Sequence, residues 1–583
     1  MATVQHSKAL IAGPYVLLSA VLFFTSLPIL LALSQLILIS DLTFIEFMHF
    51  LLGHSLLMDS LRFTILQAFV SATIAMCLGI PVAWLLSRYS WRYKSFLKSV
   101  FTLPFITPSI VAAAGFLALS SDQGILQSIG IQLNSPEHWI ARFGSSIGIE
   151  DFGMIFLLIL SHAWFNISLF IRYLEPRITT LHPDWEMQFL LLPKGGQRYY
   201  RFRYFWLPFL GGSVLTAWLF SFFFAFTSFA MIRWLTPSRY SLESLTGSFG
   251  QFAGIEGYRL DATRIVLAST LLQFFVLSFI FLMFHFQRRK MNHAYKSIIE
   301  KEHFKQQTPP PKIAKALICA FACLVLLPYV SILTSSFQIR SSTTTRGFDW
   351  SLDAWETAIF GDFDSISVTT ALSNSLLYAT VTICVILPLT ILVSLALLEI
   401  EKRGHQKTAN FFEFMCIVPV FISAVTLGIG ISIGLISFAP FLIQWRLLPA
   451  IPHIFLTFPF ALRIVHPAMQ RIDHRFFEQA KLLRCSFLKT YWLGFGIHLK
   501  SVFIVVISLS FAFSMGEFGA SFLVVRFESW TSLSLLVDTL LSRPKFDPIA
   551  YPLSMVVATI LMVFTFICLL IIDNVQGKGG EIQ

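Results

Sequence analysis

Twelve long apolar segments follow one another along this chain of 583 residues. A membrane-spanning helix needs about 20 predominantly apolar residues. Only 13% of the residues are charged, against about 25% in soluble domains. The pattern excludes a soluble protein and predicts an all-α integral membrane protein. The predicted spans are 10–38, 61–86, 97–119, 153–175, 206–232, 264–286, 314–336, 373–399, 409–438, 447–469, 500–525 and 552–573.

An internal duplication relates the two ends of the chain. Three residue types recur at the same spacing in two apolar segments, namely His162, Arg172 and Pro176 in the first and His453, Arg463 and Pro467 in the second. Both segments continue into a cationic loop and then into another apolar segment. Matched membrane units are typical of transporters. We therefore predict a first half over 1–287, a cytoplasmic linker over 288–313 and a second half over 314–583.

Lysine and arginine gather in short loops beside the predicted spans. With both termini in the cytoplasm, 12 of these residues lie outside and 30 of the 42 lie inside. Cytoplasmic loops carry the excess of basic residues in membrane proteins, so this orientation is predicted. The same clustering accounts for the net charge of +11. We expect these loops to meet membrane lipids and expect no nucleic-acid partner.

Two predicted cytoplasmic loops occupy equivalent places in the two halves. The first contains Glu186, Phe189, Leu190, Leu191, Gly195, Leu207 and Pro208, and the second contains Glu478, Ala480, Leu482, Leu483 and Arg484. A short helix with apolar residues and a glycine bend can lie along the membrane surface and enter a groove on a soluble partner. Because the two loops match in place, we interpret them as docking elements rather than ordinary basic loops.

These loops resemble the EAA loop of binding-protein-dependent ABC importer permeases. That motif is Glu-Ala-Ala, a glycine six residues after the Glu, and a Leu-Pro whose proline falls thirteen residues after the glycine. The first loop keeps Gly195, Leu207 and Pro208 but has Phe189-Leu190-Leu191 in place of Glu-Ala-Ala. The second loop keeps Glu478 and Ala480 but has Arg484 where glycine is usual. Each loop therefore supplies what the other lacks.

The fused two-half layout resembles the thiamine importer permease and the related ferric-iron importer permeases. Ser228, within Ala225–Ala230, and Glu517, within Gly516–Gly519, stand in stretches similar to theirs. The resemblance implies the type I permease fold, with about twelve helices in two six-helix halves. It also implies a bacterial inner-membrane location and thiamine or ferric iron as the solute.

The partners that the resemblance implies are a homodimer of ABC ATPase subunits and an external solute-binding protein. ATP and Mg²⁺ would bind to the ATPase, and we expect no cofactor or metal on this chain. No GxxxxGK[ST] phosphate loop occurs in the sequence. We therefore expect a permease subunit that is not itself an enzyme.

Ser228 and Glu517 are the candidate pathway residues. A carboxylate inside an apolar segment is costly and often functional. Glu517 would either face the central pathway or form a structural bond to Ser514 or a neighbouring backbone amide, and the sequence leaves both interpretations open. His162 and His453 lack a second metal-ligating residue at helical spacing, so we expect each to form a helix–helix hydrogen bond.

Two other classes of protein are compatible with a duplicated membrane chain. A secondary transporter would need several intramembrane charges for ion coupling, and the sequence offers essentially Glu517. A non-transporting scaffold or lipid-modifying enzyme is the second alternative, and no acid–base cluster supports the enzyme. Co-purification of an ATPase separates these classes from an importer permease.

Overall fold

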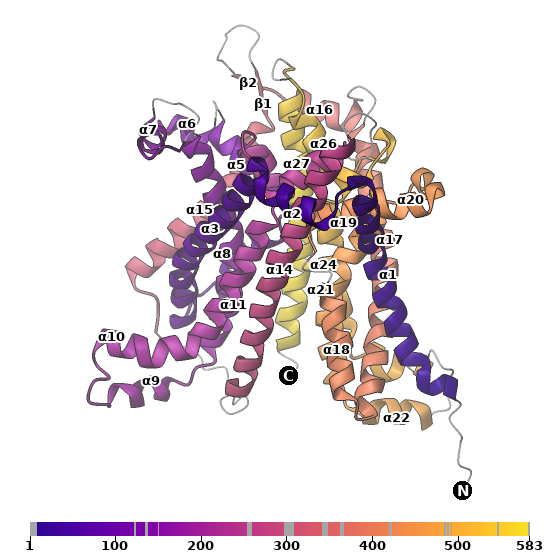
Figure 1. The fold of residues 1–583 in the computed structure, drawn as a ribbon. Coiled ribbons are helices and arrows are strands. Elements are labelled where there is room, and N and C mark those ends of the chain that lie inside the picture. The colour runs from indigo at the N-terminus through magenta and orange to yellow at the C-terminus, as the bar shows by residue number, and fades with distance from the viewer. Residues whose placement is uncertain are drawn as a thin grey trace.

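The structure, a computed structural model, describes residues 8–121, 124–133, 138–149, 151–252, 259–295, 308–340, 348–361, 367–418, 422–482, 486, 489–490, 492–544 and 547–580. It is almost entirely helical in these ranges (Figure 1). The first part of the chain forms α1 (Lys8–Ser40), α2 (Phe44–Gly53), α3 (Ser55–Arg88), α4 (Lys94–Ile106), α5 (Ser109–Ser120), α6 (Ile125–Ser128), α7 (Trp139–Ser146), α8 (Phe152–Thr179), α9 (Pro183–Leu190), α10 (Arg198–Arg201), the π-helix η1 (Phe202–Trp206), α11 (Leu207–Phe226), α12 (Ala230–Leu235), α13 (Leu242–Gly250) and α14 (Arg259–Tyr295).

The second part has a similar order of long and short helices. Its elements are α15 (Lys312–Ser335), β1 (Gln338–Arg340), β2 (Phe348–Trp350), α16 (Asp353–Phe360), α17 (Val368–Lys402), α18 (Gln406–Ile417), α19 (Ala424–Ile429), η3 (Gly430–Leu435), α20 (Ile436–Phe438), η4 (Pro440–Gln444), α21 (Ala450–Gln470), α22 (His474–Leu482), η5 (Trp492–Gly496), α24 (Lys500–Gly516), α25 (Ser521–Val524), η6 (Glu528–Trp530), α26 (Leu533–Leu541) and α27 (Ala550–Gly580). The strands β1 and β2 pair antiparallel, and the sequence analysis predicted no strand there.

Nine helices in the described ranges are long and apolar enough to cross a membrane. The predicted spans 409–438, 447–469 and 500–525 fall outside this set, because their helices are interrupted, short or less apolar. The predicted span over 97–119 consists of two helices. The chain breaks between α4 and α5 at Thr107 and Pro108, where proline removes a backbone donor and restricts the residue before it. The polar segment expected over 288–313 is partly helical, since α14 continues to Tyr295.

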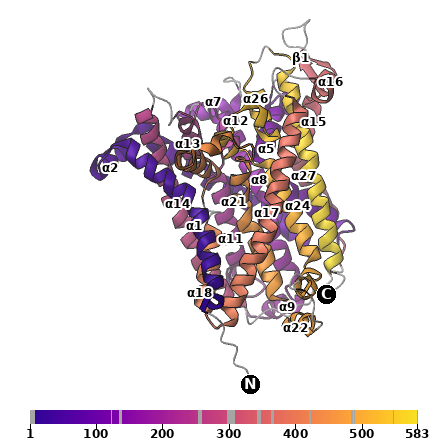
Figure 2. The same cartoon turned by 90° about the vertical axis from the view of Figure 1, so that its right-hand side faces the viewer.

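The first helix of each predicted half packs against the other half. Helix α1 contacts η3 and α17, whereas α15 contacts α4 and α5. Figure 2 shows α15 beside α27. The indole N–H of Trp164 on α8 donates to the carbonyl of Val325 on α15 at 3.0 Å. The hydroxyls of Thr107 and Tyr329 lie 2.6 Å apart. These contacts join the halves into a single helical body.

The two predicted docking loops lie at one end of the helical body. Helices α9 and α22 lie at the end where α1 begins and α27 ends, and the short helices α2, α7 and α16 lie toward the opposite end (Figure 1). The arrangement places both loops on the same side as the two ends of the described chain. Between the two ends, a buried apolar cluster that includes Phe229, Val425 and Phe518 draws on both halves.

Candidate functional site

Two phenylalanines from opposite halves stack at the centre of the structure. Phe229 lies between α11 and α12, and Phe518 lies between α24 and α25. Their ring centroids are 5.4 Å apart with an interplanar angle of 18°. The residue before each ring is one of the candidate pathway residues, Ser228 in the first half and Glu517 in the second. The stacked pair therefore brings the two candidate stretches together where the halves meet.

Glu517 binds to its own helix junction. Its carboxylate accepts hydrogen bonds from the backbone amides of Ala520 at 2.7 Å and Ser521 at 3.0 Å, and from the Ser521 hydroxyl at 2.5 Å. These amides belong to the first turn of α25, where backbone donors lack helical partners. The side chain is 8% exposed. This geometry corresponds to the structural interpretation, in which a backbone amide holds the carboxylate.

His453 completes the network around Glu517. Its Nδ1 lies 2.8 Å from the Ser514 hydroxyl, and its Nε2 lies 3.1 Å from the Ser521 hydroxyl. The same Nε2 lies 3.3 Å from a carboxylate oxygen of Glu517. Because α21 thereby bonds to α24 and α25, the predicted helix–helix hydrogen bond is found for His453. The second half thus has a closed polar cluster.

His162, at the corresponding place in the first half, lacks such partners. The side chain is 2% exposed, and neither ring nitrogen has a hydrogen-bond partner among the described residues. The expectation of a helix–helix hydrogen bond is therefore wrong for His162. Ser228 lines the same cavity, but its side chain is shorter than that of Glu517 and bonds to neither ring nitrogen.

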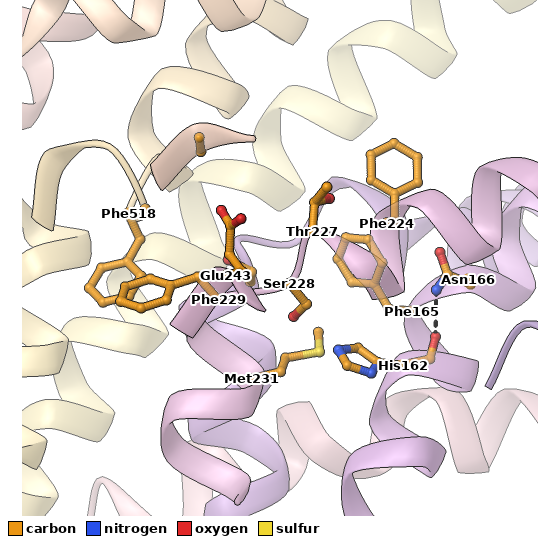
Figure 3. Close-up of a pocket in the computed structure, with 13 residues that line it drawn as sticks. His162, Phe165, Asn166, Phe224, Thr227, Ser228, Phe229, Met231, Glu243 and Phe518 are labelled. Atoms are coloured by element: carbon orange, nitrogen blue, oxygen red, sulfur yellow. Dashed lines mark hydrogen bonds between the residues drawn. The ribbon is translucent and has the colours of Figure 1, made fainter. Parts of the chain in front are cut away.

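A cavity of about 180 Å³ opens beside His162. We call it the His162 cavity, and Figure 3 shows how its labelled side chains lie. Its polar lining includes Ser109, His162, Asn166, Thr227, Ser228 and Glu243. Its apolar lining includes Phe165, Phe224, Phe229, Met231 and Phe518. Phe518 and Gly519 come from the second half, so the cavity lies where the halves meet.

Two further buried acceptors line the cavity, and the sequence analysis missed both. Asn166 donates through Nδ2 to the His162 carbonyl at 2.9 Å, and its Oδ1 has no partner among the described residues. Glu243 accepts at Oε1 from the Val425 amide at 3.2 Å, and the nearby Ser423 hydroxyl, acting against the larger effect of burial, also lowers the pKa of this carboxyl. Its Oε2 has no hydrogen-bond partner among the described residues. The sequence spacing could have indicated Asn166, because it follows His162 by about one helical turn and so lies on the same face of the helix.

Glu243 stands on α13, which is not one of the long membrane-spanning helices. The side chain is 1% exposed. Burial raises the pKa of this carboxyl from 4.5 to about 8, because a low-dielectric environment disfavours the charged form. Within the described residues, no three His, Cys, Asp or Glu side chains gather in a way that could hold a metal ion.

The first docking loop is anchored to the bundle by Glu186. Its carboxylate forms an ion pair with Arg88 at the end of α3. The Arg88 guanidinium also lies 4.7 Å from the Trp84 ring centroid. Phe189 packs inside the loop, with ring centroids 5.9 Å from Tyr200 and 5.3 Å from Phe205. The inward packing differs from the expectation that Phe189 fills a partner's groove.

Leu191 is the most exposed apolar residue of this loop, at 86%, whereas Leu190 is half-buried. Gly195 is buried, and a β-carbon there would lie 2.0 Å from the Phe189 carbonyl oxygen. A glycine is thus needed at position 195 because the backbone there lies close to the backbone of Phe189. Leu207 and Pro208 begin α11, where proline is well tolerated because the first helical N–H groups have no partner.

The second docking loop contains α22. Glu478 is exposed, Ala480 is buried, and Leu482 is 82% exposed. Leu483 and Arg484 lie outside the described residues. Helix α22 packs against η5. Both loops therefore present a short helix and one highly exposed leucine, although their sequences differ.

An ion pair joins the halves near the opposite end. Arg233 on α12 donates to Asp538 on α26 at 2.9 Å, and the Trp234 indole N–H donates to the same carboxylate at 2.8 Å. The Arg233 guanidinium lies 4.5 Å from the Phe522 ring centroid. The sequence alone does not reveal this contact, because the two residues are 305 positions apart.

Comparison with known proteins finds relatives among transport-system permeases. The chain is 24% identical to the sulfate transport system permease protein CysT of Escherichia coli over 181 residues, which are 31% of this chain and 60% of that protein. It is 25% identical to the probable sulfate permease protein of Chlorella vulgaris over 209 residues, 36% of this chain and 72% of the relative. No family model matches the chain.

A shorter match is to the molybdate/tungstate transport system permease protein WtpB of Methanocaldococcus jannaschii. It is 36% identical over 62 residues, which are 11% of this chain and 24% of that protein. The fold and these relatives together define the class: the chain is a multi-span helical membrane protein similar to transport-system permeases. None of the three relatives is named for thiamine or ferric iron.

Proposed function

We propose that this chain is the permease subunit of an ATP-driven, binding-protein-dependent ABC importer. The single observation that carries the proposal is the matched placement of α9 and α22. The two helices lie at one end of a duplicated bundle. A leucine that is more than four-fifths exposed stands at the C-terminal end of each, Leu191 directly after α9 and Leu482 as the last residue of α22. Similarity to transport-system permeases supports the same conclusion.

In the proposed complex, an ATPase homodimer contacts both helices from the cytoplasm. ATP and Mg²⁺ bind to that partner, and a solute-binding protein delivers the solute at the opposite face. The chain lies in a bacterial inner membrane with both termini in the cytoplasm. Movement of the ATPase pair is transmitted through α9 to α3, because Glu186 is ion-paired to Arg88.

Thiamine or ferric iron is the solute that the permease resemblance favours. The curated relatives instead name sulfate, molybdate or tungstate. Uptake into proteoliposomes that contain the whole complex separates these solutes. We expect labelled thiamine or ferric iron to accumulate with ATP hydrolysis, and accumulation of sulfate alone would contradict this part of the proposal.

The docking role is tested by adding charge to the two exposed leucines. Tagged full-length chain is purified from its native membranes, and ATP hydrolysis in the eluate is measured. Leu191→Glu and Leu482→Glu should each reduce the co-purified activity, because a charge opposes burial in an apolar groove. Ile129→Glu changes an exposed residue directly after α6, and α6 lies toward the opposite end (Figure 1). This variant is the matched control and should have no effect. Equal activity in all four proteins would contradict docking through α9 and α22.

A further inference from the structure

The matched histidines of the two halves, His162 and His453, have different surroundings. In the second half, Glu517 and two serines surround His453 with hydrogen-bonding groups. In the first half, the position before the stacked ring is Ser228, and both nitrogens of His162 are without partners among the described residues. A buried polar group without a partner costs about 1–3 kcal/mol. Where such a group lines a cavity, it points to an occupant, either water or a solute, that the chain itself does not supply.

The atoms around the His162 cavity indicate the chemistry of that occupant. Asn166 Oδ1 and Glu243 Oε2 are buried and have no partners among the described residues. An amide oxygen cannot donate a hydrogen bond, and neither can an ionised carboxylate. Above the pKa of Glu243, about 8, its carboxylate is ionised, and the occupant must then bring N–H or O–H donors. The ring of His162 can accept one further hydrogen bond and donate another.

The charge and aromatic character of the cavity lining further restrict the chemical class of the occupant. No lysine or arginine lines the cavity, and Glu243 is its one acidic residue. Four phenylalanines, Phe165, Phe224, Phe229 and Phe518, supply aromatic surface. Aromatic faces attract cations. A tetrahedral oxyanion would find hydroxyl donors on Ser109, Thr227 and Ser228 but no basic side chain, and it would also meet the two acceptors. An organic cation with N–H groups would satisfy both acceptors.

We propose that the His162 cavity binds a small organic cation that carries N–H donors and an apolar or aromatic face. The cavity volume is that of about six molecules of liquid water, which limits the bound part to a small head group. The proposal deepens the proposed permease function, since such a cation would be the solute, or a part of it, during passage between the halves. A bound cation also favours the ionised form of Glu243.

The test uses three probes on the purified full-length chain in detergent, at a pH above the pKa of Glu243. Benzylammonium chloride supplies the ring, the charge and the N–H donors. Benzyl alcohol is its neutral counterpart, and sodium sulfate is the oxyanion. A ligand that binds only the folded state raises the melting temperature with concentration. We expect a saturable rise of several degrees with benzylammonium, a smaller rise with benzyl alcohol and none with sulfate.

Two variants locate the effect. Ser228→Glu adds a carboxylate to the wall of the cavity that His162 also lines, so the new side chain should fill the cavity and abolish the benzylammonium shift. Ser228→Ala keeps the cavity open and should retain the shift. Glu243→Gln keeps an oxygen that can accept from the Val425 amide but removes the charge. The Glu243→Gln variant should bind benzylammonium no better than benzyl alcohol. It tests the site independently if Ser228→Glu does not fold.

Three outcomes would overturn the proposal. Stabilisation by sulfate but not by benzylammonium would make the cavity an anion site. Stabilisation by no probe would mean that the cavity holds only water. An equal benzylammonium shift in wild type and in both charge variants would place binding elsewhere. None of these results affects ATPase co-purification through Leu191 and Leu482, so the permease proposal is tested separately.

Discussion

At the residue scale, the role of Glu517 is decided by its hydrogen bonds. The carboxylate accepts from the amides of Ala520 and Ser521, and it lies beside His453. Replacement by leucine would leave two buried amide donors without partners, at about 1–3 kcal/mol each. We expect Glu517→Leu to lower the melting temperature in detergent by several degrees. Glu517→Gln retains an oxygen that can accept from an amide, so its melting temperature should fall less.

Uptake in proteoliposomes completes the comparison of the two Glu517 variants. Normal uptake by Glu517→Gln together with a destabilised Glu517→Leu would establish a structural residue. Lost uptake by Glu517→Gln at an unchanged melting temperature would instead place the carboxylate in the pathway. The structural and pathway interpretations of Glu517 thus predict opposite results for uptake by Glu517→Gln.

Glu243 should make the folded protein less stable as the pH rises. Burial raises its pKa from 4.5 to about 8, so between these values the folded protein keeps a proton that the unfolded chain releases. The associated stability is full below pH 4.5 and is lost as the pH rises through about 8. Glu243→Gln cannot titrate and should flatten this part of the melting curve plotted against pH. An unchanged slope in the variant would assign the pH dependence to another group.

At the scale of the element, the turn after α9 depends on Gly195. A β-carbon at this position would lie 2.0 Å from the Phe189 carbonyl oxygen, so a larger residue must displace the loop, at about 1–3 kcal/mol. We expect Gly195→Val to reduce uptake while ATP hydrolysis by the assembled complex continues. Gly196→Val is the matched control, because a β-carbon there meets nothing within 4 Å. Equal uptake by both variants would show that the turn does not transmit motion.

At the scale of the whole molecule, the exchange of first helices ties each half to the other. Helix α1 packs on η3 and α17, and α15 packs on α4 and α5. The body therefore has one membrane orientation, which single-cysteine labelling can measure. In a cysteine-free background, an impermeant maleimide added outside cells should label Ser145→Cys on α7 and leave Gln188→Cys on α9 unlabelled. Labelling of both from outside would contradict the cytoplasmic placement of α9.

The apolar segments determined by themselves that the chain is helical and embedded in membrane, because a bilayer admits few other structures for runs of about 20 apolar residues. The repeated His, Arg and Pro spacing indicated a duplication, and glycine and proline spacing located the first loop. These features are local, so they can be read along the chain.

Only the tertiary structure decided what surrounds each matched residue. His453 is enclosed because Glu517, 64 positions away in the sequence, reaches it, whereas His162 faces Ser228 and stays without a partner among the described residues. Glu243 on α13 and Asn166 on α8 entered the candidate site in the same way, because both line the His162 cavity although they are far apart in the sequence. A hydrogen bond between two helices depends on the distance between their side chains. The repeat of residue types along the chain gives no information about that distance.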